Sequence, residues 1–82
     1  MILMLGNRYC KDCAHAEKVL RERGVDFEFH DFSDNMEYMR EFLRLRDSAP
    51  NLFRQAIQEG NVGIPVFQLE DGRWTHALED CL

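Results

Sequence analysis

The chain has 82 residues, of which 45% are hydrophobic and 30% charged, and its formal net charge is −5 at pH 7. This length predicts one domain over residues 1–82 with a small core. The acidic balance and the scattered basic residues argue against a nucleic-acid binder, because a phosphate backbone favours a basic face. No apolar run reaches the roughly 18 to 20 residues that a membrane-spanning helix needs.

The first residues, MILML, are apolar but too short for the hydrophobic region of a secretion signal, and they lack its basic start. The sequence therefore predicts a cytoplasmic chain, in a compartment where thiols stay reduced. An odd count of three cysteines is untypical of a secreted domain held together by disulfides. In a reducing compartment, the close pair Cys10 and Cys13 is expected to be catalytic or metal-binding, and Cys81 is left over.

The first half of the chain predicts a strand, a helix and a second strand. Residues 2–5 form a short apolar run, which is typical of a strand buried on both faces. Apolar residues at i, i+3 and i+4 predict a helix over 13–22, which Gly24 ends in a left-handed cap. Alternating residues over 25–32 predict the second strand. A right-handed crossover makes the two strands parallel.

Two helices are expected next. Ser33–Asp34, with Glu37 three residues after the aspartate, is expected to cap a helix that continues to about Arg46. Asn51 is expected to cap a shorter helix that stops near Gly60. Their apolar stripes comprise Met36, Met39, Phe42, Leu43, Phe53, Ala56 and Ile57. The methionines and phenylalanines among them are expected in the core.

The last part of the chain predicts a β-hairpin. Residues 64–69 form a third apolar strand, and Asp71-Gly72 is a strong turn signal that leads into a fourth strand over 73–75. A short helical turn is expected after His76. This element order predicts an α/β fold with a mixed sheet of three or four strands flanked by helices.

The chemistry is expected at Cys10 and Cys13. Cys10 lies at the junction of the first strand and helix, where unpaired N–H groups and a partial positive charge favour a thiolate. The flanking Arg8 and Lys11 act in the same direction, whereas Asp12 opposes them. Cys13 is one turn further along the same face and can attack a mixed disulfide formed at Cys10. The pair is interpreted as a redox dithiol, with an exposed nucleophile and a partly buried resolving thiol.

A second signal is Pro65 at the start of the third strand. A cis Ile64–Pro65 bond facing the dithiol would present the backbone of Ile64 to an incoming peptide or thiol. A trans proline at the start of a strand is the alternative. His15 and His30 are expected to be solvated.

The motifs YCKDC after the first strand and GIPVF at the third resemble the glutaredoxin branch of the thioredoxin fold. The segment FLRLRDSAPNLFRQAIQEGNVGIPVF resembles the small bacterial glutaredoxin-related proteins. This resemblance covers nearly the whole chain in element order. It implies a thioredoxin-like, glutaredoxin-type fold and a thiol–disulfide oxidoreductase. Cys10 would be the nucleophile, Cys13 the resolving thiol, and Pro65 a cis proline beside them.

The resemblance also implies a site for glutathione. Arg8 stands where glutaredoxins usually carry a lysine that contacts the glycine carboxylate of glutathione. Ile64, before the proline, stands where the backbone binds the cysteine of glutathione. Tyr9 is a candidate to cover the active sulfur, or it packs beside the loop.

Several residues depart from the family pattern. Lys11-Asp12 replaces the usual proline–aromatic spacer, and Gly63 replaces a common threonine. The glycine pair and following acid that grip the γ-glutamyl end are absent, and Glu79 or Asp80 is the only echo of them. The redox chemistry therefore transfers better than the glutathione site, and a protein disulfide is an alternative substrate.

No cofactor is expected to be bound. Glutathione or an external reductase would supply reducing equivalents, and the partner would be a disulfide-containing protein or a glutathione mixed disulfide. Two other functions stay open. One is a metal-carrying module. His76 and Cys81 could join the dithiol in a zinc site, or Cys10 could hold an iron–sulfur cluster that two subunits share, as in some glutaredoxins. The other is a thioredoxin-fold binding domain whose cysteines are idle.

Overall fold

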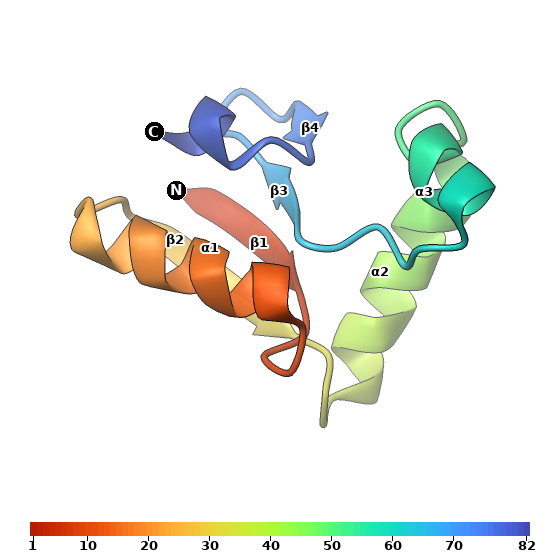
Figure 1. The fold of residues 1–82 in the computed structure, drawn as a ribbon, viewed down its shortest axis with the longest axis horizontal. Helices are drawn as coiled ribbons and strands as arrows, with labels where there is room; N and C mark the ends of the chain where they lie inside the picture. Colours follow the sequence, from red (N-terminus) through yellow and green to blue (C-terminus); the bar gives the residue numbers. More distant parts are fainter.

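The computed structural model describes all 82 residues, with a four-stranded sheet in the order β2-β1-β3-β4 at its centre (Figure 1). β1 (Ile2–Gly6) pairs in parallel with β2 (Phe27–Asp31). On its other side β1 pairs antiparallel with β3 (Val66–Gln68), which in turn pairs antiparallel with β4 (Trp74–Thr75). These pairings confirm the predicted α/β fold with a mixed sheet and a parallel first pair.

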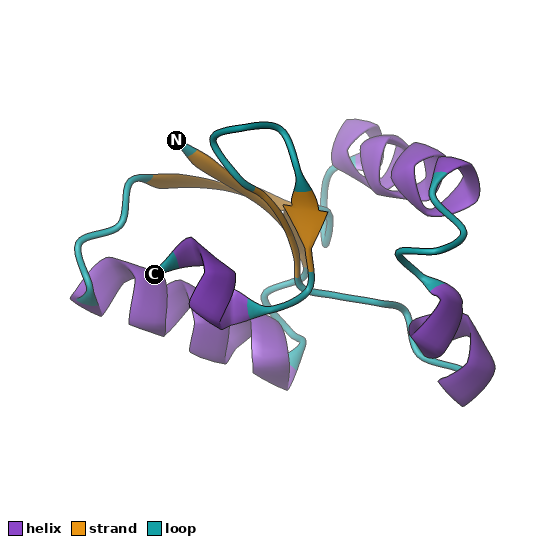
Figure 2. Ribbon diagram, turned by 90° about the horizontal axis from the view of Figure 1, so that it is seen from above, coloured by secondary structure: helices purple, strands orange, loops and turns teal.

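Helices cover both faces of the sheet. α1 (Lys11–Glu22) and a 3₁₀ turn, η1 (Leu78–Cys81), lie side by side on one face (Figure 2). α2 (Met36–Ser48) packs against the other through Phe42, and α3 (Arg54–Glu59), which has no buried residue, follows Phe53 of the same cluster. None of these helices combines the length and the apolar character needed to cross a bilayer.

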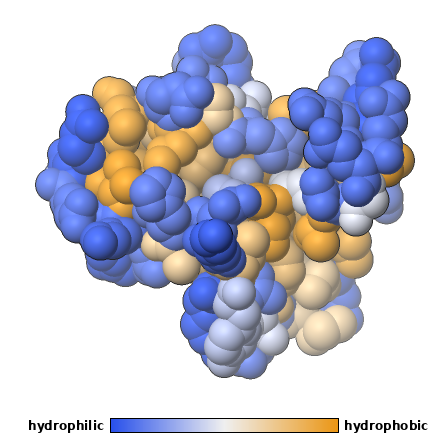
Figure 3. Space-filling model, in the orientation of Figure 1, coloured by the Kyte–Doolittle hydropathy of each residue, from blue (hydrophilic) through white to orange (hydrophobic).

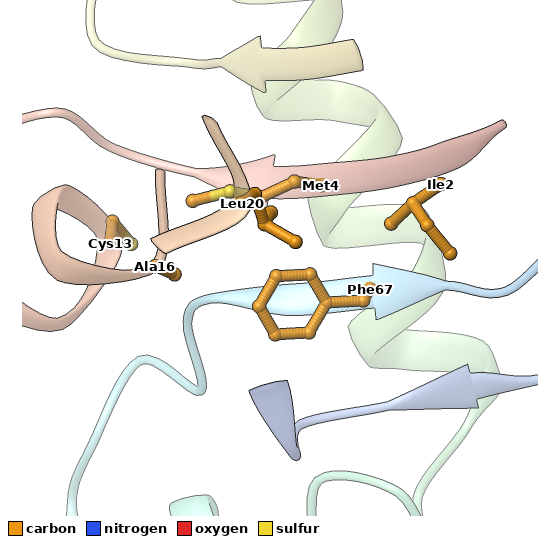
Figure 4. Close-up of a cluster of buried hydrophobic side chains, with 6 residues drawn as sticks. All are labelled: Ile2, Met4, Cys13, Ala16, Leu20 and Phe67. Atoms are coloured by element: carbon orange, nitrogen blue, oxygen red, sulfur yellow. The ribbon is translucent and has the colours of Figure 1, made fainter. Parts of the chain in front are cut away.

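The core is divided into two clusters by the central strand β1. Because successive side chains of a strand point to opposite faces, Ile2 and Met4 face α1 while Leu5 faces α2. On the α1 face, Met4 meets Leu20 and Phe67 (Figure 4). The cluster on the α2 face comprises Leu5, Phe32, Phe42, Phe53 and Val66. The strand is thus buried on both faces, as its unbroken apolar run predicts.

The predicted start of α2 is wrong by one residue. Asn35, and not Asp34, is the N-cap, and its side-chain oxygen accepts a hydrogen bond from the Tyr38 N–H at 3.1 Å. Asp34 is instead drawn to the guanidinium of Arg8, at 2.5 Å. A capping residue was thus correctly expected here, but an ion pair from a distant loop decided which one caps the helix.

The predicted cap of α3 is also wrong. Phe53 occupies the N-cap position, and the side chain of Asn51 accepts a hydrogen bond from the Arg54 side chain at 2.5 Å. At the other end, Gly60 adopts a left-handed conformation with φ 72° and ends the helix as expected.

The third strand is shorter than predicted. Pro65 has no N–H to donate to a ladder, and the Leu69 N–H donates to the Arg73 carbonyl at the hairpin turn. Only residues 66–68 therefore pair as a strand.

Some residues of the apolar stripes lie at the surface. Figure 3 shows that hydrophobic areas, in orange, occur among the hydrophilic ones on the face in view. Met36, Leu43 and Ile57 are 65%, 46% and 52% exposed, so the expectation that Met36 is in the core is wrong. Phe42 and Phe53 are buried as predicted. Helical periodicity places a residue on a side of its helix, but the width of the buried stripe depends on what packs there.

Candidate functional site

Cys10 lies at the end of a tight loop that leads from β1 into α1. It is the N-cap of α1, and no side chain caps this helix. The Cys10 N–H donates to the Asn7 carbonyl at 3.0 Å, and the Tyr9 N–H donates to the Asn7 side chain at 2.7 Å. Asn7 therefore shapes the loop and holds the half-buried Cys10 sulfur at the electropositive start of the helix.

Cys13 is fully buried, one turn into α1. Burial raises the pKa of Cys13 to about 12; a hydrogen bond from the Asn7 backbone opposes this shift, and the adjacent Cys10 adds to it. Both cysteines are free thiols. Cys10 is half-buried and not exposed as predicted, and Cys13 is fully buried and not only partly so, but Cys10 is the more accessible of the two.

The space for the Cys13 sulfur exists because residue 6 is a glycine. A Cβ atom at Gly6 would lie only 2.7 Å from the Cys13 sulfur, which is far inside van der Waals contact. This role of Gly6 was not predicted from the sequence. The available signal was a glycine at the end of an apolar strand, which can mark the close approach of another group.

Ile64 and Pro65 lie opposite the cysteine loop, and the peptide bond between them is cis. No protein group pairs with the N–H or the C=O of Ile64. Ile64 lines the same pocket as Cys10.

The segment before Pro65 is held in place by contacts with Phe53, the N-cap residue of α3, and with His76. Gly63 has φ 92°, and a Cβ atom there would meet the ring of Phe53 at 2.7 Å. The His76 Nε2–H donates to the Gly63 carbonyl at 2.9 Å, and its ring packs edge-on against Phe53, with 5.0 Å between centroids. Gly63 and His76 are thus positioning residues for Ile64, and neither role was predicted.

A pocket of about 700 Å³ separates the cysteine loop from the segment before β3. Tyr9 and Cys10 form one wall, and Val62, Ile64 and His76 belong to the opposite wall. Tyr9 is 77% exposed and stands at the rim. A volume of this size is usual for a small-molecule site or a short stretch of peptide.

Arg8 does not line this pocket. Its guanidinium donates to Asp34 at 2.5 Å, to Asp31 at 3.1 Å and to the Tyr9 hydroxyl at 3.1 Å. Burial opposes the charge of Asp31, but hydrogen bonds from Ser33 and Arg8 hold its pKa below the usual value. The structure thus brings Tyr9, Cys10 and Ile64 together and ties Arg8 to the β2–α2 connection. Its contact with a substrate carboxylate stays a prediction.

The histidines differ in their surroundings. His15 is exposed, as predicted. The expectation that His30 is solvated is wrong, because its ring is only 14% exposed and lies between Glu28 and Glu41, stacked on Tyr38.

The structure does not bring His76 and Cys81 together with the dithiol as a metal site. No group of three His, Cys, Asp or Glu side chains is arranged to hold a metal ion. Cys81 packs against the cluster under α1, where burial, followed by the charge of Asp80, raises its pKa to about 11.

Comparison with known families decides the classification. The family model described as Glutaredoxin matches residues 1–58, which is more than half of the chain. The chain belongs to the glutaredoxin family. The match includes Cys10 and Cys13 and ends before the cis bond at Pro65. No curated protein and no solved structure matches the chain significantly.

Membership of the glutaredoxin family agrees with the thioredoxin-like arrangement of a mixed sheet between helices. It assigns the chain to a family of thiol–disulfide oxidoreductases. Of the residues that were predicted for the site, Tyr9, Cys10 and Ile64 line one pocket, whereas Arg8, Cys13 and Pro65 do not line it.

Proposed function

We propose that this glutaredoxin-family chain reduces disulfides by a dithiol mechanism, with Cys10 as the nucleophile and Cys13 as the resolving thiol. The observation that carries the proposal is the contrast between the two sulfurs. Cys10 lines the pocket at the start of α1, whereas Cys13 is buried behind it with its pKa raised to about 12. Cys13 therefore stays protonated at neutral pH and does not compete for the first attack.

In the first step, the Cys10 thiolate attacks one sulfur of a substrate disulfide. A bond forms between this sulfur and Cys10, the substrate S–S bond breaks, and the departing sulfur takes up a proton. In the second step, the Cys13 sulfur attacks Cys10, and its proton ends on the second departing substrate sulfur. The substrate gains two electrons and becomes two thiols, and the two cysteines become a disulfide.

Ile64 and Tyr9 are the proposed substrate contacts. The free N–H and C=O of Ile64 suit an extended polypeptide or thiol substrate, because two such groups on one residue pair with a strand-like backbone. Tyr9 at the rim would cover the mixed disulfide. These contacts would orient the attacked sulfur towards Cys10.

The electrons that restore the dithiol must come from outside the chain. The reaction needs no bound cofactor, because electrons enter and leave through sulfur exchange. Glutathione or a reductase of the thioredoxin system is the proposed donor. The proposal also places the chain in a reducing compartment such as the cytoplasm, where the dithiol is kept reduced.

Three matched variants test this mechanism: Cys10→Ala, Cys13→Ala and Cys81→Ala. With a small model disulfide and a thiol donor, Cys10→Ala is expected to reduce turnover to the uncatalysed background. Cys13→Ala is expected to accumulate a mixed disulfide at Cys10, seen by intact mass. Cys81→Ala controls for the loss of one thiol and should stay within about twofold of the wild type, because it lies outside the pocket.

Wild-type turnover by Cys10→Ala would refute the nucleophile assignment. A wild-type protein that exchanges no faster than free cysteine would instead identify the cysteines as idle.

A further inference from the structure

The charges around the pocket bear on its substrate. Two of the residues that line it, Asp12 and Glu59, carry carboxylate side chains. No lysine or arginine belongs to the lining, although Lys11 is adjacent to Cys10 in the sequence. The nucleophilic sulfur therefore shares its pocket with two carboxylates.

These carboxylates have no cation as a partner. Glu59 accepts hydrogen bonds at 3.2 Å from the side-chain amides of Gln55 and Asn61, which hold the carboxylate in place without neutralising it. Asp12 takes part in no ion pair. Both carboxylates are therefore open to pair with a basic group of an incoming substrate.

Arg8, which lies between the lining residues Asn7 and Tyr9 in the sequence, is already engaged by acidic partners. Arg8 is bound by Asp31 and Asp34, and its guanidinium also lies 4.6 Å from the centre of the Tyr9 ring. A substrate carboxylate would have to displace two aspartates from it. An anionic substrate thus meets two free carboxylates in the pocket and a neutralised arginine beside it.

We infer that the pocket selects disulfides in polypeptides that carry lysine or arginine next to the disulfide, and that it disfavours glutathione. This inference rests on the proposed function, since it needs Cys10 to be the attacking sulfur. The basic side chain pairs with Glu59 or Asp12, while the peptide backbone pairs with Ile64. Glutathione carries two carboxylates and one amine, so it has a net negative charge that both acids repel.

The reaction is the two-step thiol–disulfide exchange through Cys10 and Cys13. The bond from Cys10 to the basic peptide forms as the peptide disulfide breaks, and Cys13 then closes the protein disulfide. The peptide takes up two electrons and two protons, and a reductase of the thioredoxin system then returns the protein to its reduced form.

The test uses three substrates: two peptide disulfides that differ only in lysine or glutamate beside the cysteine, and glutathione disulfide. Single-turnover oxidation of the reduced protein is measured, and each rate is divided by that of the same substrate with free dithiothreitol. This division removes the intrinsic reactivity of each disulfide. The expected normalised preference for the lysine peptide is about tenfold over the other two in about 20 mM salt. The ratio of normalised rates should fall towards one in about 500 mM salt, because salt screens the charges.

Two Glu→Gln variants provide a matched comparison. Glu59→Gln should lower the normalised preference about threefold, because it removes one of the two pocket charges. Glu22→Gln should leave the preference unchanged, since Glu22 ends α1, about 16 Å along the helix from its first residue.

Equal normalised rates for all three substrates, or a preference that Glu59→Gln does not alter, would overturn the inference and leave the oxidoreductase assignment standing. If no substrate reacts faster than with dithiothreitol, the proposed function fails as well.

Discussion

At the scale of single residues, the burial of the Cys13 sulfur depends on Gly6 having no side chain. Gly6 ends β1 directly beneath the start of α1, and any larger residue would displace the Cys13 sulfur. The buried position of Cys13 keeps its pKa high and its thiol protonated. Gly6 therefore contributes to the division of labour between Cys10 and Cys13 without taking part in the chemistry.

Gly6→Ala is expected to destabilise the reduced protein by about 1 to 3 kcal/mol, as is usual for an overpacked core. The cause is the clash with the Cys13 sulfur, so the same substitution in a Cys13→Ala background should have a smaller effect. Urea unfolding of the four proteins of this cycle measures the coupling. Additive effects would show that the clash is not the cause.

At the scale of elements, His30 connects β2 to α2. Its ring lies 4.2 Å from the ring of Tyr38 and nearly parallel to it. One ring nitrogen is 2.6 Å from the Glu41 carboxylate and the other is 3.1 Å from Glu28. Burial disfavours the charged imidazole, but the hydrogen bonds to Glu41 and Glu28 outweigh it and raise the pKa of His30 above its ordinary value of 6.5.

Because the pKa of His30 is raised in the folded state, the stabilisation by its protonated ring is complete below pH 6.5. It is lost as the pH rises through the raised value. The free energy of unfolding should therefore fall more between pH 6 and 8.5 for the wild type than for His30→Gln. The two carboxylates are partly exposed, so solvent screens their interaction with His30. The difference between the two proteins in the loss of unfolding free energy is therefore limited to about 1 kcal/mol.

Urea midpoints at several pH values measure this difference. His15→Gln is the control, because His15 is exposed and lies outside this cluster. Parallel pH profiles for the wild type and His30→Gln would contradict the assignment.

At the scale of the whole molecule, the α1 side of the sheet is closed by the end of the chain. η1 lies beside α1 and brings Leu78 and Cys81 against the cluster that contains Cys13 (Figure 2). The two termini lie on the same side of the molecule (Figure 1). Two thiols therefore share one apolar cluster, and burial raises the pKa values of both.

The whole fold should lose stability at alkaline pH. The ordinary thiol pKa is 9.0, and the folded values are about 12 for Cys13 and about 11 for Cys81. Stability is complete below pH 9 and falls as pH rises towards the folded values. Screening keeps the loss below the roughly 1.4 kcal/mol per pH unit of one fully buried group.

Unfolding in reducing buffer at pH 8 to 10.5 measures this loss, with the Cys13→Ala/Cys81→Ala double variant as the reference. A wild type that loses no more stability than this variant would refute the argument.

The positions of strands and helices were predictable because they depend on short-range patterns. The apolar run of β1, the alternation in β2 and the glycine after α1 each act within a few residues. The N-cap of α2 was mispredicted because Asp34 has a competing partner, Arg8, which is 26 positions away. The exposure of Leu43 and Ile57 was not predictable, since periodicity does not specify how much of a helix its neighbours cover.

The sequence by itself determined the order of elements, the pair of cysteines at the start of a helix and the proline that follows α3. These follow from local periodicity and from the chemistry of single residue types. Only the tertiary structure decided that Gly6 makes room for Cys13, that Arg8 is neutralised by two aspartates, and that Glu59 shares a pocket with Cys10. The physical reason is that these contacts join residues far apart in the chain, and they exist only once the helices have packed on the sheet.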